Sequence, residues 1–232
     1  MTDTVDALVE TAVHLADKLR KQAIGEPAWI ASKLVYEYSE QSPKVVAVLK
    51  LMRMAEGVVA FNLLRANGLF VDMGAIVRCV HDCEAEIYFL LEEYPAASPN
   101  VAKFTNAFFK HTIDSYLDVA PTPVLAKKIR AAMVRVLRGQ HDHGTAETLQ
   151  RVHKTFCGYV HAGYAHIMET YGGGPRPSFN LTGVPSLVER QKRLEVVELA
   201  ARSVMYCAAF IAHSLGLEEL RREICAACLQ DS

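Results

Sequence analysis

Three ionisable side chains recur at four-residue spacing within the apolar segment 69–94, namely Arg78, Asp82 and Glu86. Residues four apart lie on one face of a helix, so this spacing places a guanidinium beside two carboxylates. The carboxylates could share a proton or bind a metal, and the arginine could hold a phosphate. A structural network of i,i+4 ion pairs on a half-wet face explains the same spacing. Charged groups in such apolar surroundings are rarely buried unless they are paired, and either a functional site or a structural network would pair them. Both interpretations therefore stay open.

A second polar seam occupies the segment 145–171, where His153, Cys157 and His161 are again four apart. We expect this segment to form one long helix that ends at the glycine run 172–174. His161 is our main candidate for catalysis, as an acid or base or as a hydrogen-bond donor to a phosphate. The alternative is a core histidine that is satisfied by a neighbouring carbonyl or carboxylate.

Two polar seams on long, mostly apolar helices predict one shared, half-buried site. In that site His161, Arg78, Asp82 and Glu86 are the predicted catalytic group, with the carboxylates orienting the other two. The predicted substrate-binding residues surround His161 in the sequence and are Lys154, Tyr159 and Arg151.

Cysteine and histidine spacing also permits a composite metal site. Cys79 and Cys83 form an i,i+4 pair that could face His153 and Cys157 across two helices. One helix supplies two ligands easily and three only poorly, and free helical cysteines usually act as small core hydrophobes. We therefore predict no metal and no cofactor, and a metal-dependent enzyme is retained as the third function class.

Familiar catalytic signatures are missing from the sequence. No histidine follows a glutamate by three residues, as di-iron bundles require. The HExxH, Walker A, Gly-x-Gly-x-x-Gly and Gly-x-Ser-x-Gly patterns are missing as well. The glycines at 172–174 are followed by Pro175, and the next expected helix begins only after Pro185, so no helix N-terminus is close enough to form a phosphate loop.

The chain has 232 residues, about half of them apolar, and a net charge of −1. That balance argues against broad, charge-driven nucleic-acid binding, although a local basic patch could exist within it. The N-terminal segment lacks the features of a secretory signal, and the most apolar run, 204–217, is too short to span a bilayer. The six cysteines fall in expected helices and favour reduced thiols, so we expect a cytoplasmic protein without a membrane span.

Helix signals dominate the chain, and strand signals are nearly missing. We predict a single all-α domain over 1–232, a bundle of about eight or nine helices with core helices at about 43–171 and 186–215 and a long loop at 172–185. The expected helices cover residues 5–23, 27–38, 43–67, 69–94, 99–117, 123–137, 145–171, 186–215 and 217–229.

Two stretches carry a family resemblance: LLRANGLFVDMGAIVRCVHDCEAEIYFLL, and CGYVHAGYAHIMETYGG with its Phe-containing loop. Over roughly residues 63–185 the chain resembles HEPN (higher eukaryotes and prokaryotes nucleotide-binding) and abortive-infection-type helical proteins of bacteria. The resemblance implies a HEPN-like core of long antiparallel helices, a homodimer and a defence or toxin setting. Some members of this group cleave RNA without a metal, using a histidine that assists attack by the 2′-hydroxyl and an arginine that stabilises the phosphate.

The chain departs from the active HEPN pattern, which is an arginine followed after four to six residues by a histidine. Lys154 precedes His161 with six residues between them, and a lysine lacks the bidentate phosphate grip of arginine. The formal matches, Arg135 with His141 and Arg138 with His143, run into the expected loop 138–144. The function hypotheses are therefore an RNA-binding protein or metal-independent endoribonuclease, and, as the alternative, a non-catalytic helical module that binds a protein partner or a small ligand.

Overall fold

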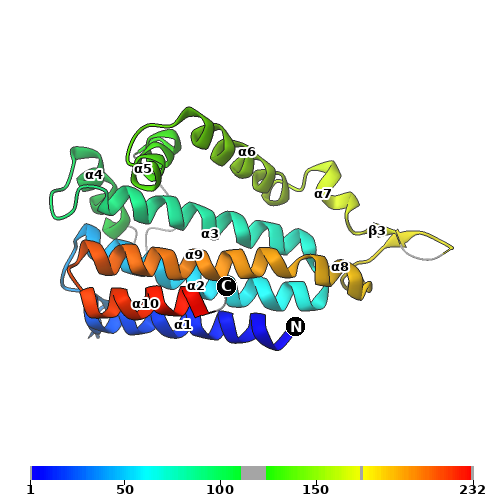
Figure 1. Cartoon of the computed structure of the whole chain (residues 1–232), viewed down its shortest axis with the longest axis horizontal. Helices are drawn as coiled ribbons and strands as arrows, with labels where there is room; N and C mark the ends of the chain where they lie inside the picture. The colour runs from blue at the N-terminus through cyan, green and yellow to red at the C-terminus, as the bar shows by residue number, and fades with distance from the viewer. Residues whose placement is uncertain (1, 111–123, 173–174, 231–232) are drawn as a thin grey trace.

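The computed structural model describes residues 2–110, 124–172 and 175–230, which are mainly helical (Figure 1). These residues form ten helical segments and two short antiparallel hairpins. The prediction of an all-α bundle is confirmed. In the described part of the chain, no helix is both long and apolar enough to cross a membrane.

Five helices pack side by side and hold most of the core (Figure 1): α1 (Thr2–Ala23), α2 (Pro43–Asn67), α3 (Phe70–Leu91), α9 (Leu194–Ser214) and α10 (Glu218–Gln230). Apolar side chains of all five helices are excluded from water, which is the main favourable contribution to folding.

Helix α2 begins and ends where its sequence predicts. The Ser42 hydroxyl accepts the N–H of Val45, and Pro43 occupies the first turn, where a missing N–H costs nothing. Gly68 ends the helix in the left-handed conformation, with φ 73°, which glycine adopts without strain. The adjoining helix α3 therefore starts at a fixed position beside α2.

Four of the remaining helices form an arm on the outer side of α3 (Figure 1): α4 (Pro99–Lys110), α5 (Ala126–Arg138), α6 (His143–Val160) and α7 (Tyr164–Met168). The short helix α8 (Leu187–Lys192) lies at the N-terminal end of α9 and contacts α2 and α9. Helices α5 and α6 pack on α3, so α3 lies between the bundle core and the arm. None of the residues in α6, α7 and α8 is fully buried, in contrast to the bundle helices.

The predicted helix over 27–38 is wrong. A hairpin of β1 (Ala28–Ile30) and β2 (Val35–Glu37) occupies this segment, with Trp29 opposite Tyr36. The two rings are in contact, with centroids 4.9 Å apart. Aromatic and β-branched residues favour strands, and a cross-strand aromatic pair stabilises the hairpin, which outweighs the helix-start signal of Pro27.

The single helix predicted over 145–171 is also wrong, because α6 ends at Val160. Ala162 adopts the left-handed conformation, with φ 51°, and the N–H of Gly163 bonds to the carbonyl of Gly158. The N–H of Ala162 bonds to the carbonyl of Tyr159, which completes a Schellman motif. This motif stops α6 and starts the short helix α7.

Two further boundaries differ from the predictions. The expected loop 172–185 contains β4 (Ser178–Phe179), which pairs with β3 (Tyr171–Gly172). The helix expected over 186–215 is divided into α8 and α9 at Arg193, although its N-cap, Ser186, accepts the N–H of Glu189 as predicted. Parts of the helices expected over 99–117 and 123–137 lie outside the described residues.

Candidate functional site

The structure brings Arg78 of α3 against the polar seam of α6. Arg78 Nη2 lies 3.2 Å from Nε2 of His153, and Arg78 Nε donates to the sulfur of Cys157 at 3.5 Å. Asp82, one turn further along α3, forms an ion pair with Arg78 and lies with Oδ1 3.8 Å from Nδ1 of His153. The two seams therefore meet through Arg78 and His153.

A third helix adds Arg130, which the sequence analysis did not single out. Its Nη1 atom lies 3.2 Å from Nδ1 of His153, so the imidazole has a guanidinium at each ring nitrogen. We call Arg78, Arg130 and His153, together with Asp82, the Arg–His cluster. The cluster joins α3, α5 and α6.

A cavity of about 330 Å³ opens beside the Arg–His cluster. Its wall includes Arg78, Asp82 and Arg130, and the start of α5 at Leu125 closes another side. Leu125 is the N-cap of α5 and makes no side-chain capping hydrogen bond. The cavity therefore presents two guanidinium groups and a helix N-terminus, both of which favour anions.

Burial and the two neighbouring guanidinium groups lower the pKa of His153 to about 4, so its imidazole is neutral at pH 7. A neutral imidazole has one accepting nitrogen, whereas both arginines can only donate. One guanidinium therefore faces an N–H group of the ring at 3.2 Å. The Arg–His cluster therefore has two positive charges but one carboxylate, and it has more hydrogen-bond donors than acceptors.

The unbalanced positive charge of the Arg–His cluster belongs mainly to Arg130. Burial and the charge of Arg78 lower the pKa of Arg130. Among the residues that the structure describes, no carboxylate lies within 4 Å of Arg130, whereas Arg78 is paired with Asp82. An anion in the cavity would compensate this charge.

Glu86, predicted to orient the site, takes part in a different interaction. Its carboxylate lies 2.6 Å from Nζ of Lys50 on α2, and both side chains are mostly buried. The same ammonium lies 5.5 Å from the ring centroid of Phe108. Glu86 borders the cavity, but its charge is already balanced by Lys50.

His161 lies away from the Arg–His cluster. It occupies the C-cap position of α6 and is exposed, and its side chain has no hydrogen bond or ion pair within the described part of the chain. A helix rises about 1.5 Å per residue, so His161 lies roughly 12 Å along the helix axis from His153. The structure thus brings His153, and not His161, together with Arg78.

Tyr159 connects α6 to the bundle. Its hydroxyl donates to Oε1 of Glu169 at 2.6 Å, and Arg193 donates to the other oxygen of Glu169 at 3.0 Å. Its ring packs on Gly74 of α3, where a Cβ would lie only 2.2 Å from the ring. Burial, followed by the Glu169 carboxylate, raises the pKa of Tyr159 to about 12. The hydroxyl that was predicted to bind substrate is therefore already occupied.

Arg151 and Lys154 are exposed on α6 and belong to a wider basic surface. Between Ala126 and Val160 the sequence has seven Lys or Arg residues against two Asp or Glu residues, in a chain whose net charge is −1. Helix α5 itself contains no acidic residue. We call the segment from Ala126 to Val160, which contains α5 and α6, the basic arm. It is a local patch of the kind that nucleic-acid binding requires.

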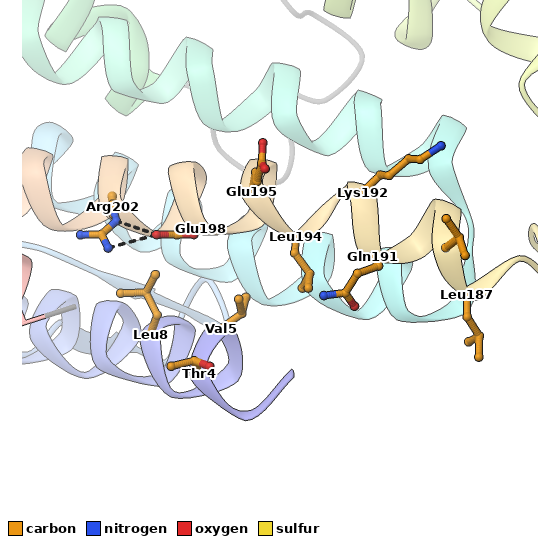
Figure 2. A pocket seen from close by; sticks show the side chains of 11 residues that line it. Thr4, Val5, Leu8, Leu187, Gln191, Lys192, Leu194, Glu195, Glu198 and Arg202 are labelled. Atoms are coloured by element: carbon orange, nitrogen blue, oxygen red, sulfur yellow. Dashed lines mark hydrogen bonds and ion pairs between the residues drawn. The ribbon is translucent and has the colours of Figure 1, made fainter. Parts of the chain in front are cut away.

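The second concave feature lies on another side of the molecule, between α1, α8 and α9 (Figure 2). This α8–α9 groove has a volume of about 750 Å³. Val5 and Leu8 face Leu194 across it, and the ion pair of Glu198 with Arg202 lies at its rim. At its end, Leu187 and Val188 are 76% and 65% exposed.

Within the described residues, no group of three or more His, Cys, Asp or Glu side chains is arranged to hold a metal ion. Cys157 accepts a hydrogen bond from Arg78, and no metal-binding group among the described residues joins it to Cys79 and Cys83. No protein-family model, curated protein or solved structure matches the chain.

Proposed function

We propose that the protein binds RNA and that the Arg–His cluster receives a backbone phosphate. The observation that carries this proposal is the pair of guanidinium groups on the two nitrogens of one neutral imidazole. A phosphate oxygen accepts hydrogen bonds from both arginines and removes the donor surplus. The basic arm supplies the longer-range attraction for the neighbouring phosphates.

The same arrangement supports metal-independent cleavage. When the phosphate takes over the hydrogen bonds of a guanidinium, the accepting nitrogen of neutral His153 is released and can take the proton of a ribose 2′-hydroxyl. The 2′-oxygen then attacks phosphorus, and the bond to the 5′-oxygen breaks. The leaving 5′-oxygen takes a proton from solvent, and the two guanidinium groups stabilise the charge that develops on the phosphoryl oxygens. Asp82, 3.8 Å from Nδ1, stabilises the imidazolium that forms. A bound phosphate raises the low pKa of His153, so the imidazole becomes a stronger base when substrate is present.

The HEPN resemblance extends the proposal to a cytoplasmic homodimer in a defence or toxin setting. The six cysteines are free thiols, which fits a reducing compartment. Helices α6 and α7 contain no fully buried residue, which leaves this side of the arm available to a second subunit. In this version of the HEPN-like site the histidine is His153, and its arginines come from two other helices.

The test combines RNA binding and RNA cleavage in EDTA for wild type, His153→Gln, Arg130→Gln and His161→Gln, with folding checked by circular dichroism. Arg135→Gln is the matched control, because it removes the same charge from α5 but from an exposed pair with Glu92. We expect Arg130→Gln to weaken binding and His153→Gln to abolish cleavage, while His161→Gln stays close to wild type. Arg135→Gln should weaken binding less than Arg130→Gln, because it removes only a long-range contribution of the basic arm. Cleavage that depends on His161 and not on His153 would move the active centre back to the sequence-based candidate. Absence of binding to any single-stranded RNA by wild type would overturn the proposal.

The α8–α9 groove supports a second candidate function, a module that binds an amphipathic helix of a protein partner. Its apolar floor and charged rim match the surface that such a helix presents at positions i, i+3 and i+4. The double substitution Leu187→Asp and Val188→Asp would block partner binding and leave RNA binding unchanged. These two residues are exposed, so the change adds charge without disturbing the core.

A further inference from the structure

The hairpin of β3 and β4, which follows α7, carries two exposed aromatic rings, those of Tyr171 and Phe179. The two residues are directly opposite each other in the two strands, so their side chains share one face of the hairpin. Their ring centroids are 5.0 Å apart, and the rings meet edge to face. They remain 43% and 48% exposed, so a flat ligand can reach both rings from solvent. We call Tyr171 and Phe179 the aromatic pair.

The chain holds this hairpin in place on both of its sides. The carbonyl of Thr170 accepts the backbone N–H of Asn180 at 2.8 Å and its side-chain amide at 3.0 Å, which closes the base of the hairpin. Further along the chain, the N–H of Val184 donates to the carbonyl of Gly68 at 2.9 Å, and Arg190 Nε donates to the carbonyl of Val184. The aromatic pair is therefore positioned before a ligand arrives, which lowers the entropic cost of binding.

The charges around the aromatic pair favour a polyanion. The elements α5, α6, α7 and β3 follow one another along one side of the molecule, so the hairpin continues the basic arm (Figure 1). Over residues 161–188 the sequence has a single carboxylate side chain, that of Glu169, and it already forms an ion pair with Arg193. Arg176, between the two strands, is exposed. A polyanion that lies along the basic arm therefore reaches the aromatic pair without meeting an unpaired carboxylate of this segment.

We propose that the aromatic pair stacks on unpaired bases of a single-stranded RNA whose backbone follows the basic arm. Every base has a π-face, so stacking on Tyr171 and Phe179 adds affinity without requiring a particular sequence. A base-paired strand keeps its bases inside the duplex, where neither ring can stack on them. The inference rests on the proposed RNA binding, and it narrows the substrate class of that function to single strands.

The experiment measures RNA binding by the full chain with fluorescence anisotropy, and circular dichroism checks folding. The probes are a single-stranded RNA, the same strand annealed to its complement, and a strand of the same length with abasic sites in place of its nucleotides. The double variant Tyr171→Leu with Phe179→Leu keeps two apolar side chains and removes both aromatic rings. The matched control is Trp29→Leu with Tyr36→Leu, which removes the two exposed rings of the β1–β2 hairpin, whose centroids are 4.9 Å apart.

We expect the double variant at Tyr171 and Phe179 to bind the single strand about tenfold more weakly than wild type, a loss typical of a stacked base. Wild type should lose about the same factor on the abasic strand, whereas the double variant should lose almost nothing further. The abasic comparison uses the unaltered protein, so it does not depend on how the variant folds. The control should bind the single strand as wild type does, and all three proteins should bind the duplex equally.

The outcomes separate this inference from the proposed function. Binding that depends on Arg130 but is the same in wild type and in the double variant overturns the stacking inference and leaves the proposed function standing. If wild type binds no single-stranded RNA, both are overturned. If the double substitution changes the sedimentation of the free protein and leaves its RNA affinity unchanged, the aromatic pair belongs to a subunit interface and the inference is overturned. An equal loss of affinity for duplex and single strand also overturns it, because paired bases cannot stack on the rings.

Discussion

Arg130 Nη1 lies 3.2 Å from Nδ1 of His153, while Arg78 approaches Nε2 of the same ring at the same distance. One imidazole thus separates two cations that come from α3 and α5 and that would otherwise repel each other directly. Such an arrangement is costly without an anion, because like charges in a partly desolvated site interact strongly. The relationship between Arg130 and His153 therefore indicates a ligand-binding site more strongly than the ion pair of Arg78 with Asp82, which is self-contained.

Arg130→Gln is predicted to change the salt dependence of RNA binding. Each phosphate that a protein neutralises on a single strand contributes about −0.7 to the slope of log K against log salt concentration, so removing one contact should reduce the slope by about that amount. Fluorescence anisotropy titrations between low and moderate salt measure it. Arg130→Lys should restore most of the slope, because a point charge remains, but not the full affinity. An unchanged slope in Arg130→Gln would mean that this guanidinium does not touch the RNA backbone.

His153 is predicted to make the folded state sensitive to mild acid. Its pKa is about 4 in the folded protein and 6.5 when unperturbed, so between these values the unfolded chain binds more protons. Above pH 6.5, His153 should therefore make no pH-dependent contribution to the free energy of unfolding. As the pH is lowered from 6.5 towards 4, His153 should lower that free energy. Urea unfolding across this range should show a smaller decline for His153→Gln than for wild type. His161→Gln, which changes an exposed histidine, should decline as wild type does, and equal slopes for all three proteins would contradict the assignment.

Local signals explain which parts of the fold could be predicted from the sequence. The cap at Ser42, the stop at Gly68 and the cap at Ser186 are encoded by residues within one turn of the helix end, and all three are confirmed. The end of α6 was missed because its left-handed residue is Ala162, whose side chain disfavours that conformation and gives no stop signal. The hairpin at Trp29 was missed because Pro27 also suits a helix start.

Only the part of the candidate site that depends on spacing within one helix could be predicted from the sequence. Arg78 and His153 were recognised as members of two seams, and the structure places them in contact. Which histidine of the α6 seam meets Arg78 depends on how α6 is aligned along α3, which no spacing within one helix reveals. Arg130 was missed for the same reason, since its position depends on how α5 packs against α3. The only local signal was the excess of Lys and Arg over acidic residues in α5.

Tyr159→Phe is predicted to loosen α7 and α6 without unfolding the bundle. The substitution removes the hydroxyl that donates to Glu169 at 2.6 Å but keeps the ring that packs on Gly74. The lost hydrogen bond should cost about 1.5 kcal/mol of unfolding free energy, the lower end for a charged acceptor, because Glu169 keeps its bond to Arg193. Urea unfolding measures this cost, and hydrogen exchange should show the increase in α6 and α7 peptides. A loss above about 3 kcal/mol would indicate that Tyr159 has a larger structural role than one hydrogen bond.

Gly74→Ala is predicted to separate α6 from α3 and thereby to disturb the Arg–His cluster from a distance. A Cβ at position 74 would lie 2.2 Å from the Tyr159 ring, so the ring and the end of α6 must shift. Overpacking of this kind typically costs about 1–3 kcal/mol, although alanine alone favours a helix. Gly144→Ala is the matched control in the first turn of α6, because its Cβ would meet only Asp142 Oδ1, at 3.9 Å. Thermal unfolding should show a lower midpoint for Gly74→Ala and an unchanged or slightly higher one for Gly144→Ala. If RNA binding is then lost in Gly74→Ala alone, the packing of Tyr159 on α3 is what holds His153 between its two arginines.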